Sequence, residues 1–397
     1  MTSRTIVELH VLQTVPPSNL NRDDTGTPKS AVYGGVRRAR VSSQAWKRAT
    51  RQAFQQILDP AELGVRTRRL AELLGARIRK IDESIPEAEA WNLAAETVTA
   101  ATGAKVEPPK RNTKEGGPAP APEARYLIFL SARQLDALAE LAVKGRDDVK
   151  AFFKAKENKT AAKQLANSRH SVDIALFGRM VADGSDINVD AAAQVAHAIS
   201  VHRADVESDY YTAVDDHKER EEDDKGAGMI GTVEFNSATL YRYAALDVDL
   251  LRANLGRGLR DGEPADTPVR RAVEAFVRGF VESLPTGKIN TFGHHTLPDA
   301  VIVKVRSTRP VNFVGAFERP CRVGEESGGY VLQASERLAK QIPAIETAFG
   351  VGAGTETWVT RVGEDTEALS LLGTELPLDE LVAAVGAEVE RRQNGSA

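Results

Sequence analysis

The sequence predicts an α+β protein: a sheet interrupted by a large helical insertion and by a second, acidic insertion. Strand-like alternation of apolar and polar residues occurs in three separate parts of the chain, at residues 4–14, 234–248 and 299–305. Between residues 57 and 167 the pattern is instead mostly helical, with many arginines and glutamates. Residues 203–232 are acidic, polar and rich in glycine at their end. These observations predict the fold class and its interruptions.

The chain begins with a predicted strand, in which Val7, Leu9 and Val11 alternate with Ile6, Glu8 and His10. A long polar loop follows, and a helix is expected to begin near Ser42 or Ser43. Either hydroxyl can cap this helix by accepting a backbone N–H of the first turn. One side of the helix is apolar and consists of Trp46, Ala49, Ala53 and Ile57, and the opposite side is cationic and consists of Lys47, Arg48 and Arg51.

The insertion at 57–167 is expected to contain several helices. Residues 59–101 are amphipathic with a helical period, and the segment 107–122, EPPKRNTKEGGPAPAP, is expected to be a flexible loop. Tyr126–Leu130 is short and apolar. Ser131 then caps a helix through Val143, and Lys- and Ala-rich sequence continues the helical region to about residue 166.

The second half of the chain supplies the remaining strands and helices. Residues 171–180 are expected to form a buried strand, and 189–201 an alanine-rich helix or a partly buried segment. Thr267-Pro268 is expected to cap a helix, and two further helices are expected near 335–347 and 378–391. Without the insertions, the order is strand, helix, strand, strand, helix, strand. This is the ferredoxin-like βαββαβ plan, which RNA-recognition modules share.

The composition excludes several classes of protein. No stretch approaches the roughly 20 apolar residues that span a bilayer, and the N-terminus lacks the pattern of a secretory signal. Cys321 is the single cysteine of the 397 residues, so an intrachain disulfide and a thiolate metal cluster are excluded. We therefore expect a cytoplasmic protein without a membrane partner.

A basic segment, Asn21–Arg51, stands out on a chain with a net charge of −4. It contains two acids and eight cations, for a local charge of +6: Arg22, Lys29, Arg37, Arg38, Arg40, Lys47, Arg48 and Arg51. Such a concentration favours binding of a polyanion, although a solvated cationic face is the alternative. Because the arginines at 37, 38 and 40 lie in a strand-like stretch, we expect only one side of it to reach a ligand.

Catalytic and metal sites have weaker support. No carboxylate or cysteine stands at ligand spacing beside His294-His295, and the acidic residues 215–224 are expected to form a solvated tip. A ribonuclease is a second hypothesis, with His202, Asp215 and Asp216 as candidates, but no nucleophile, base and stabiliser stand at recognisable spacing. A general single-strand binder is a third.

Several motifs together resemble one family. They are LNRDD (20–24), the Gly-, Arg- and Ser-containing run at 34–49, DIALFGRM (173–180), YYTAVDD (210–216) and GTVEFNS-YRYA (231–244). In the same order, from residue 6 to about 320, they resemble the CasC family. CasC is the RAMP-class backbone subunit of the type I-E CRISPR Cascade complex, and it binds the CRISPR RNA.

The resemblance implies a hand-shaped protein. An RRM-like palm would comprise residues 1–57, 168–201 and 233–397, a helical fingers insertion 58–167, and a thumb hairpin 202–232. Copies of the chain would polymerise along one CRISPR RNA beside other Cascade subunits and displace a base at regular intervals. The guide would then pair with target DNA. No catalysis, cofactor or metal is implied.

The resemblance also implies roles for individual residues. The RNA-backbone contacts would be Arg22, Lys29, Arg38, Ser42, Gln44, Lys47, Arg48 and Arg51, which bind without reading sequence. Met180 would be a wedge at the displaced nucleotide, with a core methionine as the alternative. Tyr211 and Thr212 would insert beside the kink, where the family often has Trp-Phe in place of Tyr210-Tyr211; ordinary hairpin packing is the alternative. Lys288 and Asn290 lie in a loop that could face RNA.

Overall fold

The computed structural model describes residues 4–109, 120–181, 184–213, 229–256, 263–264, 267–323 and 329–395. The chain divides into two compact units. The sheet unit comprises residues 1–53, 195–245 and 276–397, and the helical unit comprises residues 54–194 and 246–275. The helical unit is thus wider than the insertion expected at 58–167. The α+β class predicted from the sequence is confirmed.

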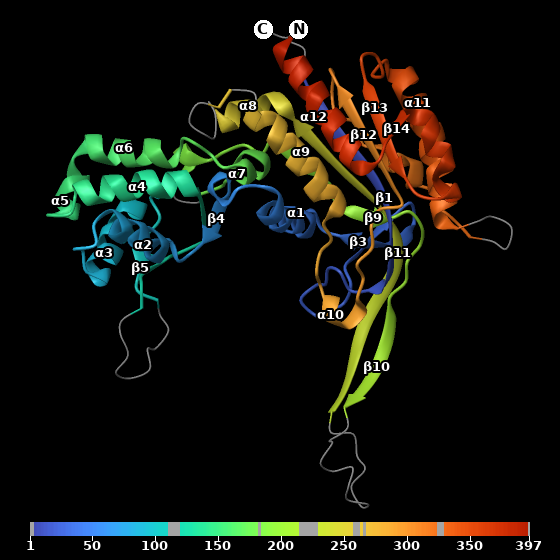
Figure 1. The fold of residues 1–397 in the computed structure, drawn as a ribbon. Helices are drawn as coiled ribbons and strands as arrows, with labels where there is room; N and C mark the ends of the chain where they lie inside the picture. The colour runs from blue at the N-terminus through green and yellow to red at the C-terminus, as the bar shows by residue number, and fades with distance from the viewer. Residues whose placement is uncertain are drawn as a thin grey trace, which may run out of the picture. The chain divides into compact units, whose positions relative to one another are not determined.

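The sheet unit is built on a ten-stranded sheet (Figure 1). Its central strands lie in the order β12-β1-β11-β9. They are β1 (Ile6–Ser18), β9 (Ala198–Ser200), β11 (Met229–Asp247) and β12 (Ala300–Arg306). β1 pairs with β12 and β11 pairs with β9, both antiparallel. Neighbours in the sheet are distant in sequence, so the sheet joins segments from the beginning, middle and end of the chain.

Shorter strands extend this sheet on both sides. β13 (Glu356–Arg361) and β14 (Thr374–Glu375) follow β12, while β3 (Val36–Val41) and β2 (Ser30–Tyr33) follow β9. β8 (Ala193–Val195) pairs with β11. The loop expected before the first helix therefore contains a β-hairpin.

The two faces of the sheet have separate cores. Leu240 of β11 packs with Trp46 of α1 (Ser43–Ile57), whereas its neighbour Tyr241 packs with Phe317 and with Leu338 of α11 (Tyr330–Phe349). This is the alternation expected of a strand covered on both faces. The other elements of the C-terminal part are η4 (Phe313–Phe317), η5 (Glu364–Leu372) and α12 (Leu378–Asn394), and the two predicted C-terminal helices are confirmed.

A buried ionic network crosses one face of the sheet. Glu8 of β1 and Arg306 of β12 are both fully buried and form an ion pair. Arg306 also donates to Glu346 of α11 at 2.6 Å, and Tyr243 donates to Glu8 at 3.2 Å. Burial is the largest influence on Glu8 and raises the pKa of its carboxyl, although Arg306 opposes the shift.

In the middle of the chain the predicted strand at 171–180 is wrong, and of the two alternatives for 189–201 only the partly buried segment is confirmed. Residues 171–180 form the helix α7 (Val172–Phe177) followed by an extended turn, not a strand. Residues 189–201 form β8 and β9 rather than a helix, although the segment is partly buried as expected. A short apolar run does not distinguish a helix from a strand by periodicity. The second strand, which the sequence predicted at 171–180, is therefore absent from those residues, and the next strands along the chain are β8 and β9.

The helical unit has its own apolar core. Most of its helices match the predicted insertion: α2 (Leu70–Ile81), α3 (Glu87–Thr102), α4 (Ala132–Lys144), α5 (Val149–Lys154) and α6 (Lys156–Ala166). Ser131 caps α4 as predicted, in a capping box with Gln134. The remaining elements of this region are η1 (Pro60–Glu62), β4 (Gly64–Thr67), β5 (Val106–Glu107), β6 (Glu123–Ala124), β7 (Ile128–Ser131), η2 (Ser185–Ile187) and α8 (Val248–Leu255).

A long hairpin extends from the sheet unit (Figure 1). β10 (Glu207–Ala213) pairs antiparallel with the first part of β11. The expected acidic tip at 215–224, with Asp215 and Asp216, lies outside the described residues. The same holds for 110–119 of the predicted loop at 107–122. The last two helices are α9 (Thr267–Glu282), as predicted, and α10 (Ile289–Phe292). Along the described ranges, no helix is long and apolar enough to cross a membrane.

Candidate nucleic-acid interface

The start of α1 is hydrogen-bonded to the loop at residues 19–29, which is called the basic loop below. The Ser42 hydroxyl accepts the backbone N–H of Ala45 at 3.3 Å, so Ser42 caps the helix as predicted. The backbone N–H of Ser42 donates to the Asn21 side chain at 2.9 Å. Ser42 is itself buried. Ser42 therefore stabilises the first turn of α1 and also binds the loop to this end of the helix.

The loop at 19–29 is ordered by its own side chains. The Asp23 carboxylate accepts the backbone N–H groups of Thr25 and Thr27, both at 3.0 Å, and the Thr25 hydroxyl at 2.7 Å. These hydrogen bonds, chiefly that from the Thr25 side chain, lower the pKa of Asp23. The Asn19 amide donates to the carbonyls of Gly26 and Glu234, each at 2.9 Å. One of the two acids of the basic segment, Asp23, thus accepts hydrogen bonds from its own loop while it stays exposed.

The predicted RNA contacts of this segment differ in their exposure to solvent. Arg22, Gln44 and Arg48 are exposed, and Lys29, Lys47 and Arg51 are half-buried. Partial burial lowers the pKa of Lys47. Within the ranges that the structure describes, neither Arg22 nor Arg48 forms an ion pair. Their charges are therefore available to a polyanion.

Arg38 requires a correction. Its side chain is fully buried, and its guanidinium donates to the carbonyls of Tyr33 at 3.1 Å, Ser200 at 3.0 Å and Phe317 at 2.8 Å. The turn between β2 and β3 is packed closely against the same segment, because a Cβ at Gly34 would lie 1.6 Å from the Glu318 carbonyl oxygen. Arg38 holds β2 and β3 against η4 and is removed from the candidate RNA contacts.

A buried cation supports α1 from the sheet. The guanidinium of Arg242 lies over the rings of Trp46 and Phe280, at 3.8 and 4.6 Å from their centroids. It donates to Gln13 at 2.6 Å and to the carbonyl of Phe280. Burial lowers the pKa of Arg242 to about 9. The pattern predicted Trp46 as the buried side of α1, but it did not reveal this partner.

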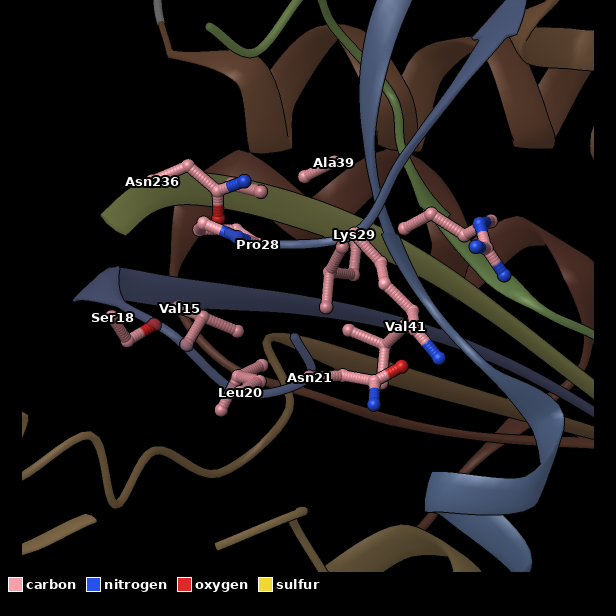
Figure 2. A pocket seen from close by; sticks show the side chains of 12 residues that line it. Val15, Ser18, Leu20, Asn21, Pro28, Lys29, Ala39, Val41 and Asn236 are labelled. Atoms are coloured by element: carbon pink, nitrogen blue, oxygen red, sulfur yellow. The ribbon is translucent and has the colours of Figure 1, made fainter. Parts of the chain in front are cut away.

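A pocket lies between the loop and the sheet (Figure 2). Val15 and Ser18 of β1, Pro28 and Lys29 of the loop and Asn236 of β11 are among its lining residues. Its volume is about 20 Å³, which is room for about one water molecule. This pocket therefore does not suit a small-molecule substrate, and the residues around it act as a surface.

The loop of Lys288 and Asn290 packs against the basic loop. A Cβ at Gly287 would lie 2.4 Å from the carbonyl oxygen of Leu20 and 2.6 Å from that of Asn19, so only glycine allows this approach. Lys288 has a left-handed backbone, with φ of 49°, and is half-buried, while Asn290 is exposed. The structure thus brings this predicted loop beside the basic segment. The glycine that makes the contact was not singled out from the sequence.

The hairpin of β10 and β11 exposes aromatic side chains. Tyr210 is 63% exposed and Tyr211 is 41% exposed, and Thr212 is also exposed. Tyr211 lies opposite Gly231 in the register, and a Cβ on Gly231 would come within 2.4 Å of the tyrosine ring. The ring therefore lies across the glycine backbone. This contact holds one face of Tyr211 on the hairpin.

Met180 belongs to the helical unit and is 83% exposed, so it is not a core methionine. The turn before it is closely held. Gly178 has φ of 76° and approaches the Val189 carbonyl, which a Cβ would reach at 2.7 Å. Arg179 is buried and donates to the Ile187 carbonyl through Nε at 2.9 Å. Burial lowers the pKa of Arg179 to about 10. Arg179 was not singled out from the sequence, although an arginine within the apolar run DIALFGRM is a signal that indicates such a role in holding the turn.

Of the histidines considered for catalysis, His202 and His294 are engaged in the fold. His202 is buried, its Nε2 accepts the backbone N–H of Thr239 at 3.1 Å, and its Nδ1 lies 2.7 Å from the Arg203 carbonyl. Its ring stacks on Tyr330 at 3.7 Å. His294 is buried with Nε2 3.2 Å from the Pro285 carbonyl, while His295 is exposed. Among the residues whose placement is described, no group of His, Cys, Asp and Glu could hold a metal ion.

Comparisons with known proteins found similar solved structures and one family. The chain is similar to a solved structure described as a CRISPR RNA-guided surveillance complex, pre-nicking, with 33% identity and a TM-score of 0.77; the match covers 96% of this chain and 99% of that one. A second, described as a CRISPR RNA-guided surveillance complex, has 30% identity, a TM-score of 0.69 and the same coverages. No curated protein matches. The CT1975-like protein family matches residues 7–384, and the chain belongs to this family.

Proposed function

We propose that this chain is a CRISPR RNA-binding backbone subunit of a Cascade surveillance complex. The observation that carries the proposal is the ordered basic loop and α1, which present exposed cations beside a helix N-terminus in a chain similar to subunits of RNA-guided complexes. Free backbone N–H groups at a helix N-terminus and flexible cations bind phosphates without reading bases. The affinity would come from the RNA backbone, and sequence recognition from guide pairing.

The finer assignment is to the CasC family of type I-E, with an RRM-like palm. In this proposal several copies polymerise along one guide RNA in the cytoplasm, beside other Cascade subunits, and the guide pairs with target DNA. The exposed Tyr211 and Thr212 of the hairpin and the exposed Met180 support a role in displacing a base. An aromatic face stacks on any base, so this displacement would not depend on sequence.

We further propose that the chain is not an enzyme and needs no cofactor. Of the three candidates for a ribonuclease, only His202 lies within the described residues, and both its ring nitrogens contact backbone groups. Incubation of the full chain with labelled precursor RNA, with and without magnesium, should leave the RNA intact. Specific cleavage that is lost in Asp215→Ala would overturn this part.

RNA binding is tested on α1. In a filter-binding assay the full chain should bind single-stranded RNA with an affinity that falls steeply with salt. Replacing Lys47 and Arg48 together by alanine should lower the affinity roughly tenfold. The slope of log K against log salt should fall by the amount expected for the loss of about one to two phosphate contacts. The control is Lys340→Ala, on exposed α11 surface, which should bind like the parent. Equal binding by all three proteins would contradict the proposal.

Polymerisation and pathway need a different measurement. RNA that co-purifies with the chain should carry CRISPR repeat sequence at its end, and light scattering should show several chains on each RNA. Heterogeneous cellular RNA bound by single chains would instead favour the general single-strand binder.

A further inference from the structure

Three side chains from separate segments of the sheet unit come together, and two of them, Lys29 and Arg40, line the pocket of Figure 2. Lys29 precedes β2, Arg40 lies in β3 and His197 precedes β9. The backbone N–H of Arg40 donates to the Lys29 carbonyl at 2.9 Å. Arg40 also lies opposite Ile199 in the ladder, two residues from His197. These backbone contacts place Lys29 and His197 next to Arg40, although both residues lie just outside the strands.

The guanidinium of Arg40 is oriented by two contacts. Its Nε donates to the carbonyl of Ser30 at 3.2 Å, and its Nη1 lies 3.1 Å from Nδ1 of His197. Because a guanidinium can only donate, Nδ1 of His197 must accept, and the neutral ring carries its proton on Nε2. In the described part of the chain, Nη2 of Arg40 and Nε2 of His197 have no hydrogen-bond partner. Two donor nitrogens, Nη2 of Arg40 and Nε2 of His197, therefore remain for a ligand.

The potential at this place is positive. Partial burial lowers the pKa of His197, and the charges of Arg40 and Lys29 lower it further, so both cations act on the ring. Neither Lys29 nor Arg40 forms an ion pair with any residue that the structure describes. Oriented N–H donors next to an ammonium group are the chemistry that recognises a phosphodiester.

We infer that Lys29, Arg40 and His197 form a phosphate subsite for single-stranded RNA, separate from the cations of α1. Nη2 of Arg40 and Nε2 of His197 donate to the oxygens of one phosphodiester, and Lys29 contributes charge. The subsite rests on the proposed function and adds Arg40 and His197 to the RNA contacts. His197 has two parts in it, because it both donates to the phosphate and orients Arg40.

The test measures RNA affinity of the full chain over a range of salt concentrations at pH 8, with a labelled single-stranded RNA of mixed sequence. Arg40→Gln should weaken binding roughly tenfold and lower the slope of log K against log salt by about 0.7, the value for one phosphate on a single strand. His197→Ala should weaken binding about threefold and leave the slope unchanged, because the neutral ring adds no charge. The double variant should lose less than the product of the two effects, since His197 orients Arg40.

Two variants serve as controls. Arg40→Lys keeps the charge but loses the oriented fork, so it should keep the slope and still lose affinity. Arg309→Gln removes an exposed cation elsewhere in the sheet unit and should behave like the parent. Thermal unfolding identifies any variant that does not fold. If Arg40→Gln does not fold, the affinities of Arg40→Lys and His197→Ala decide whether the subsite exists.

The outcomes separate the two proposals. If the parent chain does not bind RNA, the proposed function fails. If the parent binds and Arg40→Gln has the parent's slope and affinity, the cluster is a solvated cationic edge and this inference alone is overturned. Loss in Arg40→Gln with no loss in His197→Ala removes the histidine from the subsite.

Discussion

The guanidinium of Arg242 lies 3.8 Å from the centroid of the Trp46 ring, and both side chains are fully buried. Trp46 is on the apolar side of α1, and Lys47 and Arg48 follow it on the cationic side. The orientation of α1 on the sheet therefore depends on a cation held between two aromatic rings. The buried side of the helix thus sets the position of the cations proposed to bind RNA.

Replacing Arg242 should destabilise the sheet unit. Arg242→Ala removes the stacking on Trp46 and leaves the Gln13 side chain without its buried donor, so the free energy of unfolding should fall by about 3 kcal/mol. Arg242→Met restores the volume and removes a buried charge, so it should cost less than half of that. Urea unfolding followed by tryptophan fluorescence measures both. An alanine variant as stable as the parent would show that the stacking contributes nothing.

The ion pair of Glu8 and Arg306 predicts strong coupling between β1 and β12. Breaking it by Arg306→Met leaves a buried carboxylate without its main partner, which should cost about 3–5 kcal/mol. Glu8→Gln with Arg306→Met should recover part of this loss, because the unpaired charge is removed. A double-mutant cycle on the free energy of unfolding measures the coupling. Additive single effects would mean that the two side chains do not interact in solution.

Acid should destabilise the chain through His170. Burial, followed by the charge of Arg179, lowers the pKa of His170 from 6.5 to about 4, and the Gln134 amide lies 3.0 Å from its Nδ1. Between these values the unfolded chain binds a proton that the folded chain does not. This histidine's contribution to stability is therefore complete above about pH 6.5 and falls as pH decreases toward 4, by up to about 1.4 kcal/mol per pH unit.

His170→Asn tests this assignment, because asparagine keeps a hydrogen-bonding group but does not titrate. Urea unfolding of both proteins at pH 7, 6 and 5 should give a smaller loss of stability in the variant. Parallel loss in both would assign the acid sensitivity to other groups, such as the fully buried His10, whose pKa burial also lowers.

Gly231 should control the placement of Tyr211. A methyl group in Gly231→Ala would come within 2.4 Å of the tyrosine ring and must displace it. Under the proposed function, base displacement should weaken in Gly231→Ala and in Tyr211→Ala, and combining them should add little. Fluorescence of an RNA with 2-aminopurine at successive positions measures displaced bases. Thr232→Ala, an exposed neighbour in the same strand, is the control; equal fluorescence in all of these proteins would exclude Tyr211 from the kink.

Much of the fold was predictable from local pattern. The strands at the start of the chain and near residue 300, helix α1 and the capped helix α4 have a clear period or cap, and each was predicted within a few residues. Residues 171–180 and 189–201 were not, because short apolar runs suit either a helix or a strand. Pairing with β3 and β11 decides that Ala198–Ser200 is a strand.

The sequence by itself determined the α+β class, the helical insertion, the charge of the basic segment and the two sides of α1, because period and charge are properties of neighbouring residues. Only the tertiary structure decided which cations are presented. Arg38 and Arg40 are two residues apart in one strand, yet Arg38 is fully buried among carbonyls and Arg40 is oriented by His197. Contacts between segments distant in sequence make that difference, because burial and hydrogen-bond partners depend on what packs over a strand.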